Sequence, residues 1–223
     1  MDWSPILISM RTAGLSIVFT FFMGILAAWM VVRISHSLMK TILDGIFTIP
    51  LVLPPTVAGF FLLYVFGVKR PVGQFFLEYF SVKIAFSWGA TVLAAVVMSF
   101  PLMYRSARGA FEQVDDTLVQ AARTLGMGEW TIFRKVLLAN AVPGVVSGGV
   151  LAFARGLGEF GATAMIAGNI AGKTRTLPMA VYSEVAAGNM EAAYSYVAII
   201  VVIAFLSVFL MNGAMWYSQK KSR

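Results

Sequence analysis

The sequence Gln120-Ala121-Ala122-Arg123-Thr124-Leu125-Gly126 is a short polar stretch between two long apolar blocks. Hydrophobic residues occupy 59% of the 223 positions and charged residues only 12%, against about 45–50% and about 25% in soluble proteins. Several apolar runs approach the roughly 20 residues that a helix needs to cross a bilayer. The chain is therefore predicted to cross a membrane several times, and the polar stretch to lie in the water beside it.

Five membrane-spanning helices are predicted from the apolar runs. Their approximate ranges are residues 10–33, 42–66, 86–105, 141–162 and 195–217. Helices are expected because every backbone polar group in a bilayer needs a partner within the protein. The first block lacks a preceding basic region and a cleavage site, so it is interpreted as a span and not as a signal peptide. The predicted fold is an all-α integral membrane protein with a single domain, residues 1–223.

Two polar segments connect these spans. Residues 106–140 lie between the third and fourth spans and contain the polar stretch. Residues 163–194 lie between the fourth and fifth spans and are too polar to cross the membrane simply. This second segment is either re-entrant or a further helix.

The basic residues predict the orientation, because Lys and Arg are enriched in cytoplasmic loops. If residues 106–140 are cytoplasmic, that side receives ten basic residues: Arg33, Lys40, Arg105, Arg108, Arg123, Arg134, Lys135, Lys220, Lys221 and Arg223. The outside then receives six: Arg11, Lys69, Arg70, Lys83, Lys173 and Arg175. This arrangement places the N-terminus outside and the C-terminus in the cytoplasm. The net charge of +7 is thereby explained by topology, and no nucleic-acid partner is expected.

Three prolines interrupt the second predicted span. Pro50, Pro54 and Pro55 each remove a backbone donor, so the helix is expected to bend or break between Ile49 and Pro55. Such a break is either a structural kink or part of a helix that lines or gates a pathway.

Arg155 and Glu159 are ionisable residues within the fourth predicted span. Four residues apart on a helix, they share a face and can pair. Charges at such a depth face the protein interior or an aqueous route. The pair is therefore either a structural lock or a source of positive potential along an anion route, and we expect no tight anion site within the spans.

A relaxed phosphate-loop pattern, Ala167-Gly168-Asn169-Ile170-Ala171-Gly172-Lys173-Thr174, follows the fourth span. A phosphate loop requires a preceding strand and a following helix, whereas this pattern follows a membrane helix. We interpret it as a turn in which Lys173 and Arg175 form a basic outer mouth. The chain has no cysteine, so disulfides and thiolate metal sites are excluded, and no metal or cofactor is predicted.

The polar stretch has the features of a docking surface. Asp115 or Asp116 can cap a helix that ends at Gly126, since glycine adopts positive φ readily. A second short helix can follow over 129–138, with Trp130 and Phe133 as apolar anchors. No nucleophile, base or metal spacing accompanies this helix-turn-helix, so an enzyme is not predicted.

This stretch resembles the "EAA" loop of the membrane subunits of ABC importers. Gln120-Ala121-Ala122 and Gly126 fall in its register, with Arg123 and Glu129 in the same loop. Two positions depart from the pattern: Gln120 replaces glutamate and Ala139 replaces proline. The resemblance implies that residues 106–140 are a cytoplasmic coupling loop.

Other stretches narrow the resemblance to oxyanion importers, and to molybdate permeases in particular. They are Ile49–Val57, Met98–Leu102, Phe153–Ala162 and Gly172–Pro178. The resemblance implies the fold of type I importers and a homodimer in the cytoplasmic membrane. It also implies two cytoplasmic ATPase subunits, which alone bind ATP and magnesium, and an extracytoplasmic oxyanion-binding protein. Tungstate or sulfate import remains an alternative, as does a self-sufficient secondary anion transporter or channel.

Overall fold

The computed structural model describes residues 2–221, with side chains described up to Leu210 and at Gly213. The described residues form helices and contain no strand. Their order is α1 (Ser4–Val32), α2 (Ser37–Val52), α3 (Pro55–Phe66), α4 (Pro71–Phe80), α5 (Trp88–Glu112), α6 (Asp116–Thr124), α7 (Glu129–Ile132), a π-helical turn (Phe133–Leu137), α8 (Leu138–Leu157), α9 (Gly161–Ile166), α10 (Leu177–Ala186) and α11 (Met190–Lys221). The predicted all-α membrane fold is confirmed.

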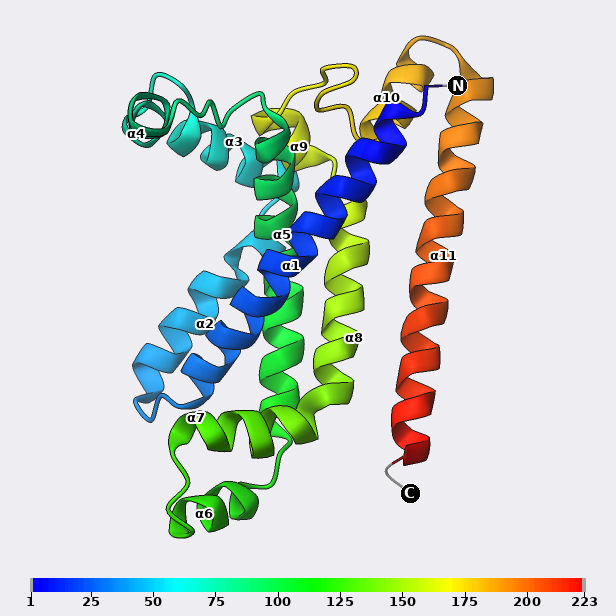
Figure 1. The fold of residues 1–223 in the computed structure, drawn as a ribbon. Coiled ribbons are helices and arrows are strands. Elements are labelled where there is room, and N and C mark those ends of the chain that lie inside the picture. The colour runs from blue at the N-terminus through cyan, green and yellow to red at the C-terminus, as the bar shows by residue number, and fades with distance from the viewer. Residues whose placement is uncertain (1, 222–223) are drawn as a thin grey trace.

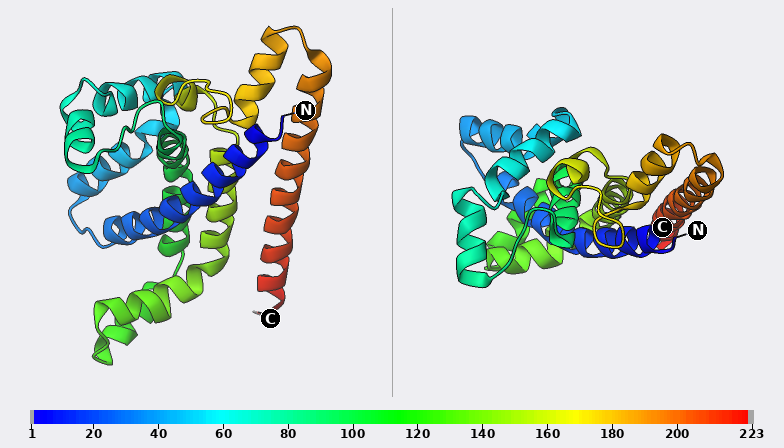
Figure 2. Two further views of the ribbon diagram at one scale, coloured as in Figure 1. Left: turned by 45° about the horizontal axis from the view of Figure 1, so that its top comes forward. Right: turned by 90° about the horizontal axis from the view of Figure 1, so that it is seen from above.

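The chain passes back and forth along one axis (Figures 1 and 2). Helices α1, α5, α11 and the α7–α8 segment are each long and apolar enough to cross a membrane, and the bent pair α2–α3 can supply a fifth span. Helices α6 and α7 lie at one end of the molecule, and α4, α9 and α10 lie at the other (Figure 1). Helix α1 begins at the end that carries α10, and α11 finishes at the α6–α7 end (Figure 1).

The core of the bundle is formed by α1, α5 and α8, which pack along one another. Small and hydroxyl residues occupy these contacts, as is common where membrane helices approach closely. Thr12 and Thr20 of α1 form hydrogen bonds with Thr91 (2.8 Å) and Ser99 (3.0 Å) of α5. These buried hydroxyl pairs fix the register of α1 against α5.

The second span is broken between α2 and α3, as the prolines predict. The two helices meet at an angle of 111°, and Leu53 and Pro54 between them are extended. Pro55 begins α3, where its missing N–H costs nothing. Pro50 lies inside α2 and not at the break. The break is therefore caused by Pro54 and Pro55.

The fourth span begins earlier than the apolar run predicts. Pro143 lies inside α8, which is continuous with α7 through the π-helical turn. Figure 1 shows this continuous segment turning from the base of the molecule into the bundle. The apolar run marks where the helix enters the membrane, whereas the helix itself begins earlier, at Glu129.

The GxxxG face of α8 packs within the chain. A Cβ atom at Gly144 would lie 2.6 Å from Ala110 Cβ, and one at Gly148 would lie 2.5 Å from Ser106 Cβ. Both neighbours belong to α5, so any larger side chain at either glycine would push α5 and α8 apart.

Residues 163–194, whose structure the sequence left open, contain most of α9 and all of α10. The two helices have 6 and 10 residues, too short to cross a bilayer. Both lie at the end opposite α6 and α7 (Figure 1). The segment therefore returns to the side on which it began.

Candidate functional site

Helix α6 begins at a side-chain cap. Asp115 Oδ1 accepts a hydrogen bond of 2.8 Å from the backbone N–H of Thr117, which identifies Asp115 rather than Asp116 as the N-cap. This hydrogen bond to the charged form lowers the pKa of Asp115 below its ordinary value. The beginning of the helix thus lies three residues after the end of α5.

Helix α6 ends at Gly126, as predicted. Gly126 has φ of +73°, and its N–H donates to Arg123 O at 2.9 Å. The next N–H, of Met127, donates to Ala122 O at 3.1 Å. These two bonds form a Schellman motif, in which the residue at the glycine position must be left-handed.

The two alanines of the polar stretch point in different directions. Ala121 is exposed, together with Gln120, whereas Ala122 is 5% exposed and packs inward. The two alanines do not form a single shallow Ala–Ala face, because neighbouring residues on a helix are about 100° apart. Exposed apolar side chains from α6 and its turn surround Ala121 instead, namely Leu118 (47%) and Leu125 (79%). We call residues 116–130 the docking knob.

Aromatic packing attaches the docking knob to the end of α1. Trp29 of α1 lies 5.8 Å from Trp130 and 4.7 Å from Phe133, between ring centroids. Phe133 is 5% exposed and acts as the predicted anchor, but Trp130 is 55% exposed and leaves one face free. The knob is therefore supported by the bundle while Trp130 and Leu125 stay exposed on its surface.

Glu129 is the charged centre of this attachment. Its Oε1 accepts a hydrogen bond from Arg123 Nε at 2.9 Å, and its Oε2 lies 3.2 Å from Arg33 Nη2. The hydrogen bond from Arg123 lowers the pKa of Glu129 and, reciprocally, raises that of Arg123. One carboxylate thus links α1, α6 and α7, a role that the sequence did not reveal.

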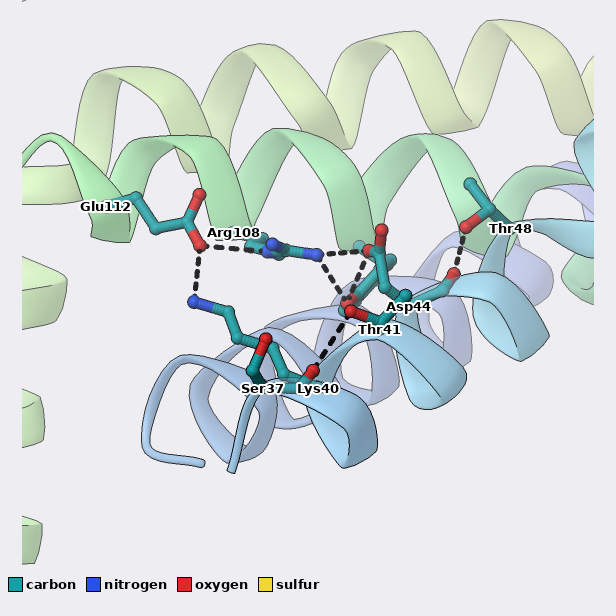
Figure 3. Close-up of polar contacts among 8 residues, drawn as sticks. Ser37, Lys40, Thr41, Asp44, Thr48, Arg108 and Glu112 are labelled. Carbon is teal, nitrogen blue, oxygen red and sulfur yellow. Dashed lines mark hydrogen bonds and ion pairs between the residues drawn. The ribbon is translucent and has the colours of Figure 1, made fainter. Parts of the chain in front are cut away.

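A second polar network joins α2 to α5 just above the docking knob (Figure 3). Asp44 of α2 pairs with Arg108 of α5 and accepts a hydrogen bond of 2.9 Å from Tyr104 Oη. Arg108 Nε donates to Glu112 Oε1 at 3.0 Å, and Lys40 Nζ lies 3.1 Å from the same oxygen. Each of these charged residues of α2 therefore faces a residue of opposite charge on α5.

Sequence reasoning missed this network, although a signal was present. Asp44 lies inside the second predicted span, where an acidic residue needs a partner. Arg108 lies beyond the predicted end of the third span, at residue 105, but α5 continues to Glu112. The extra two turns of helix bring Arg108 and Glu112 opposite α2.

Arg155 and Glu159 are brought together at the other end of the molecule. Arg155 Nη1 lies 2.6 Å from Glu159 Oε2. They do not share one helix as expected, because α8 ends at Leu157. The side chain of Glu159, 1% exposed, also accepts a hydrogen bond of 2.7 Å from Ala162 N at the start of α9. The pair therefore fastens the end of α8 to the beginning of α9, which favours the structural reading.

Lys173 and Arg175 lie in the loop between α9 and α10. Lys173 is exposed, and Arg175 Nε donates to Asn169 Oδ1 at 2.9 Å. Thr174 is fully buried and bonds within the loop, where it accepts from Ile170 N at 3.0 Å. The loop is thus a closed turn at the end of the molecule that carries α4 and α10, with Lys173 projecting from it.

The acidic and histidine residues of the described region do not converge. Among residues 2–221, no three of them are placed so that they could hold a metal ion. The functional geometry of the described region consists instead of a helical knob, two charge networks and a broken span.

The comparisons with known proteins agree with this geometry. Residues 20–223 match the family model described as "Binding-protein-dependent transport system inner membrane component". The molybdenum transport system permease protein ModB of Escherichia coli K12 is 43% identical over 222 residues, which are 99% of this chain and 96% of the relative. A protein of Bacillus subtilis 168, named as the putative molybdenum transport system permease protein YvgM, is 40% identical over 94% of this chain and 92% of its own.

Solved structures share the fold at low sequence identity. The MetNI methionine ABC transporter, in an inward-facing conformation, superposes with a TM-score of 0.74 at 18% identity and covers 96% of this chain and 94% of its own. A bacterial ABC transporter that imports alginate gives 0.79 at 15% identity, covering 96% and 78%. The chain therefore belongs to the family of binding-protein-dependent transport system inner membrane components.

Proposed function

We propose that this chain is the membrane subunit of an ABC importer that moves a tetrahedral oxyanion, molybdate, into the cell. The observation that carries the proposal is similarity over nearly the whole length to molybdenum transport permeases at 36–43% identity. A homodimer of the chain forms the route, two cytoplasmic ATPase subunits drive it, and an extracytoplasmic binding protein delivers the anion. The chain itself is non-catalytic and holds no cofactor, since ATP and magnesium bind to the ATPase.

The docking knob is the part that receives the ATPase. Both of its arms continue directly into spans: only three residues lie between the end of α5 and the beginning of α6, and α7 runs into α8 through the π-helical turn. A displacement of the knob therefore moves α5 and α8 without an intervening flexible loop. ATP binding elsewhere in the complex can in this way bias the spans between two rigid-body arrangements.

The network of Asp44 and Arg108 extends this movement to the broken span. Because α2 is joined to α5 by ion pairs, a shift of α5 is transmitted to α2 and to the break at Pro54 and Pro55. We infer that α2 and α3 move with the knob and open or close the route.

In this proposal, the α6–α7 end faces the cytoplasm. Among the described side chains, that end carries seven of the ten basic residues assigned to the inside, from Arg33 to Lys135; the other three lie beyond Leu210, outside the described side chains. The loop with Lys173 and Arg175 then faces outward, where a positive mouth attracts anions. The N-terminus is outside and the C-terminus is in the cytoplasmic space.

The proposal is tested by reconstituting the chain with its ATPase and binding protein in proteoliposomes. ATP hydrolysis is expected to rise when the binding protein is loaded with molybdate, and to rise less with sulfate. Tungstate has the same shape and charge as molybdate, so the rate of ATP hydrolysis with each of the two anions is compared to identify the substrate. A rate of ATP hydrolysis that does not change with molybdate, tungstate or sulfate would contradict the proposal.

A further inference from the structure

A cavity of about 620 Å³ lies between α5 and α8 at the α6–α7 end of the bundle. Helix α6 contributes Leu118 to it, and Asp115 lies beside that residue at the base. The polar side chains that line the cavity are Arg105, Ser106, Gln113, Asp115, Asn140 and Ser147. The cavity is therefore a polar pocket in a mostly apolar protein.

Arg105 is the cation of this cavity. It is exposed, and within residues 2–221 no carboxylate pairs with it. Arg108, one turn further along α5, is by contrast bound to Asp44 and Glu112. Arg105 is seven residues from the end of α5 at Glu112, about 10 Å along the helix axis.

A charge at this depth is costly when it faces lipid. Arg105, Gly109 and Gln113 are spaced four residues apart and so share one face of α5, and all three line the cavity. The polar character of this face indicates that it meets water or a second copy of the chain, and not acyl chains.

The other groups in the cavity can complement an anion. The side chains of Ser106 and Gln113 form no hydrogen bond within the described region and can donate into the cavity. Asn140 instead donates its amide N–H to Val136 O at 2.7 Å. Asp115 adds one negative charge at the base, but its Oδ1 is already bonded to Thr117 N.

The size of the cavity indicates weak binding. At roughly 30 Å³ per water molecule, it is far larger than one oxyanion and holds a hydrated ion with several waters. A transport route requires such weak contacts, because an ion that binds tightly is not released.

We propose that this cavity is a transient binding site for the oxyanion on its way out of the membrane, with Arg105 supplying the positive charge and Ser106 and Gln113 donating hydrogen bonds. This rests on the proposed function, since the anion must be cargo to pass here. The geometry assigns the site to the inner half of the route, between the helices that flank the docking knob.

The chain has no cysteine, so a single thiol can report on the cavity. A Cβ at Gly109 has no atom within 4 Å, so Gly109→Cys probes the cavity. Ser37→Cys, at an exposed position outside both the cavity and the docking knob, is the matched control. Each variant is assembled into the complete complex. The reaction of cysteines in the partner subunits is measured with the unsubstituted chain and subtracted.

The measurement is the rate of reaction with a negatively and a positively charged methanethiosulfonate. Relative to Ser37→Cys, Gly109→Cys is expected to favour the negative reagent by on the order of tenfold. Adding Arg105→Gln is expected to abolish this preference, and Arg105→Lys to keep it. Molybdate or tungstate is expected to slow the reaction at Gly109→Cys more than a chloride solution of equal ionic strength.

The proposed site would be refuted if the ratio of reaction rates with the negative and the positive reagent were the same at the two cysteine positions. It would also be refuted if the preference for the negative reagent persisted in the Arg105→Gln variant. Failure of both reagents to reach Gly109→Cys would also overturn it, because the cavity would then be covered.

Uptake separates this inference from the proposed function. Arg105→Gln is expected to lower molybdate uptake severalfold while ATP hydrolysis continues, and Lys135→Gln, an exposed charge outside the cavity, is expected to leave uptake unchanged. An equal loss of molybdate uptake in both variants would show that the positive charge of this end of the molecule matters, and not the position of Arg105 in the cavity. Absence of ATP-driven uptake in the unsubstituted complex would instead refute the proposed function, whatever the thiol rates show.

Discussion

Arg108 of α5 forms an ion pair with Asp44 of α2, one turn before α5 ends and the chain enters the docking knob. The side chain of Arg108 is 21% exposed and that of Asp44 is 39% exposed. Since Asp44 is partly solvated, the pair contributes little to stability, about 1 kcal/mol or less. Its importance lies in its position, because it joins α2, a helix that has no fully buried residue of its own, to the helix that leads into the knob.

A double-mutant cycle tests this connection. Asp44→Asn and Arg108→Gln are each expected to lower the ratio of molybdate transported to ATP hydrolysed, because α2 no longer follows α5. The double variant is expected to be no worse than either single one, since both remove the same link. Tyr104→Phe, which removes only one hydrogen bond to Asp44, serves as the mild control, and additive losses would show that the two residues act independently.

Gly126 is expected to tolerate no β-branched side chain. Its φ is +73°, and a Cβ there would meet nothing within 4 Å, so the cost is backbone strain alone, about 1–2 kcal/mol. Gly126→Val should therefore unwind the turn after α6 and lower uptake more than ATP hydrolysis. Gly126→Asn, whose short polar side chain tolerates the left-handed conformation, should retain most of the coupled transport, and full coupling in Gly126→Val would refute the docking role of the turn.

Glu159 is expected to be a stability residue. Its carboxylate is held by Arg155 and by Ala162 N, and Glu159→Gln leaves the Arg155 charge without its partner. The loss in free energy of unfolding should be about 2–4 kcal/mol, measured as a fall in the unfolding temperature of the purified complex. Replacing both charges with apolar residues should restore most of that loss. A change in anion selectivity without a change in stability would favour the transport-path reading instead.

The link between the knob and α1 is expected to weaken in acid. The folded-state pKa of Glu129 is lowered by the hydrogen bond from Arg123, so its stabilisation is present above the unfolded value of 4.5 and is lost as the pH falls through the lower folded value. Trp29 packs against Trp130 and under the guanidinium of Arg33, which pairs with Glu129, so tryptophan fluorescence should change in that pH window. Glu129→Gln should remove the transition, and an unchanged acid transition in that variant would assign it to another group.

Features set by local sequence were predictable. The apolar runs located the spans, because a helix must be about 20 residues long to cross the bilayer. An N-cap at Asp115 or Asp116 and the turn at Gly126 followed from the backbone preferences of single residues. The break near Pro54 and Pro55 followed from the missing donors in the same way.

Features set by tertiary contacts were not predictable. Whether Ala121 or Ala122 faces outward depends on how α6 sits against α1 and the π-helical turn, and the sequence alone does not determine this. The pairing of Asp44 with Arg108 required α5 to extend past the membrane boundary that hydropathy marks. For the same reason the sequence did not show that the helix beginning at Glu129 runs on into the fourth span, since hydropathy reports membrane entry and not helix ends.

The central claim is that this chain transports molybdate only as part of an ATP-driven complex. Its most direct test is uptake of labelled molybdate into proteoliposomes that contain the chain alone, or the chain with its ATPase and binding protein and with ATP inside or outside. The account predicts uptake only in the complete system, and only when ATP is on the side of the ATPase. Molybdate uptake by the chain alone, driven by an ion gradient or by the anion gradient itself, would contradict it.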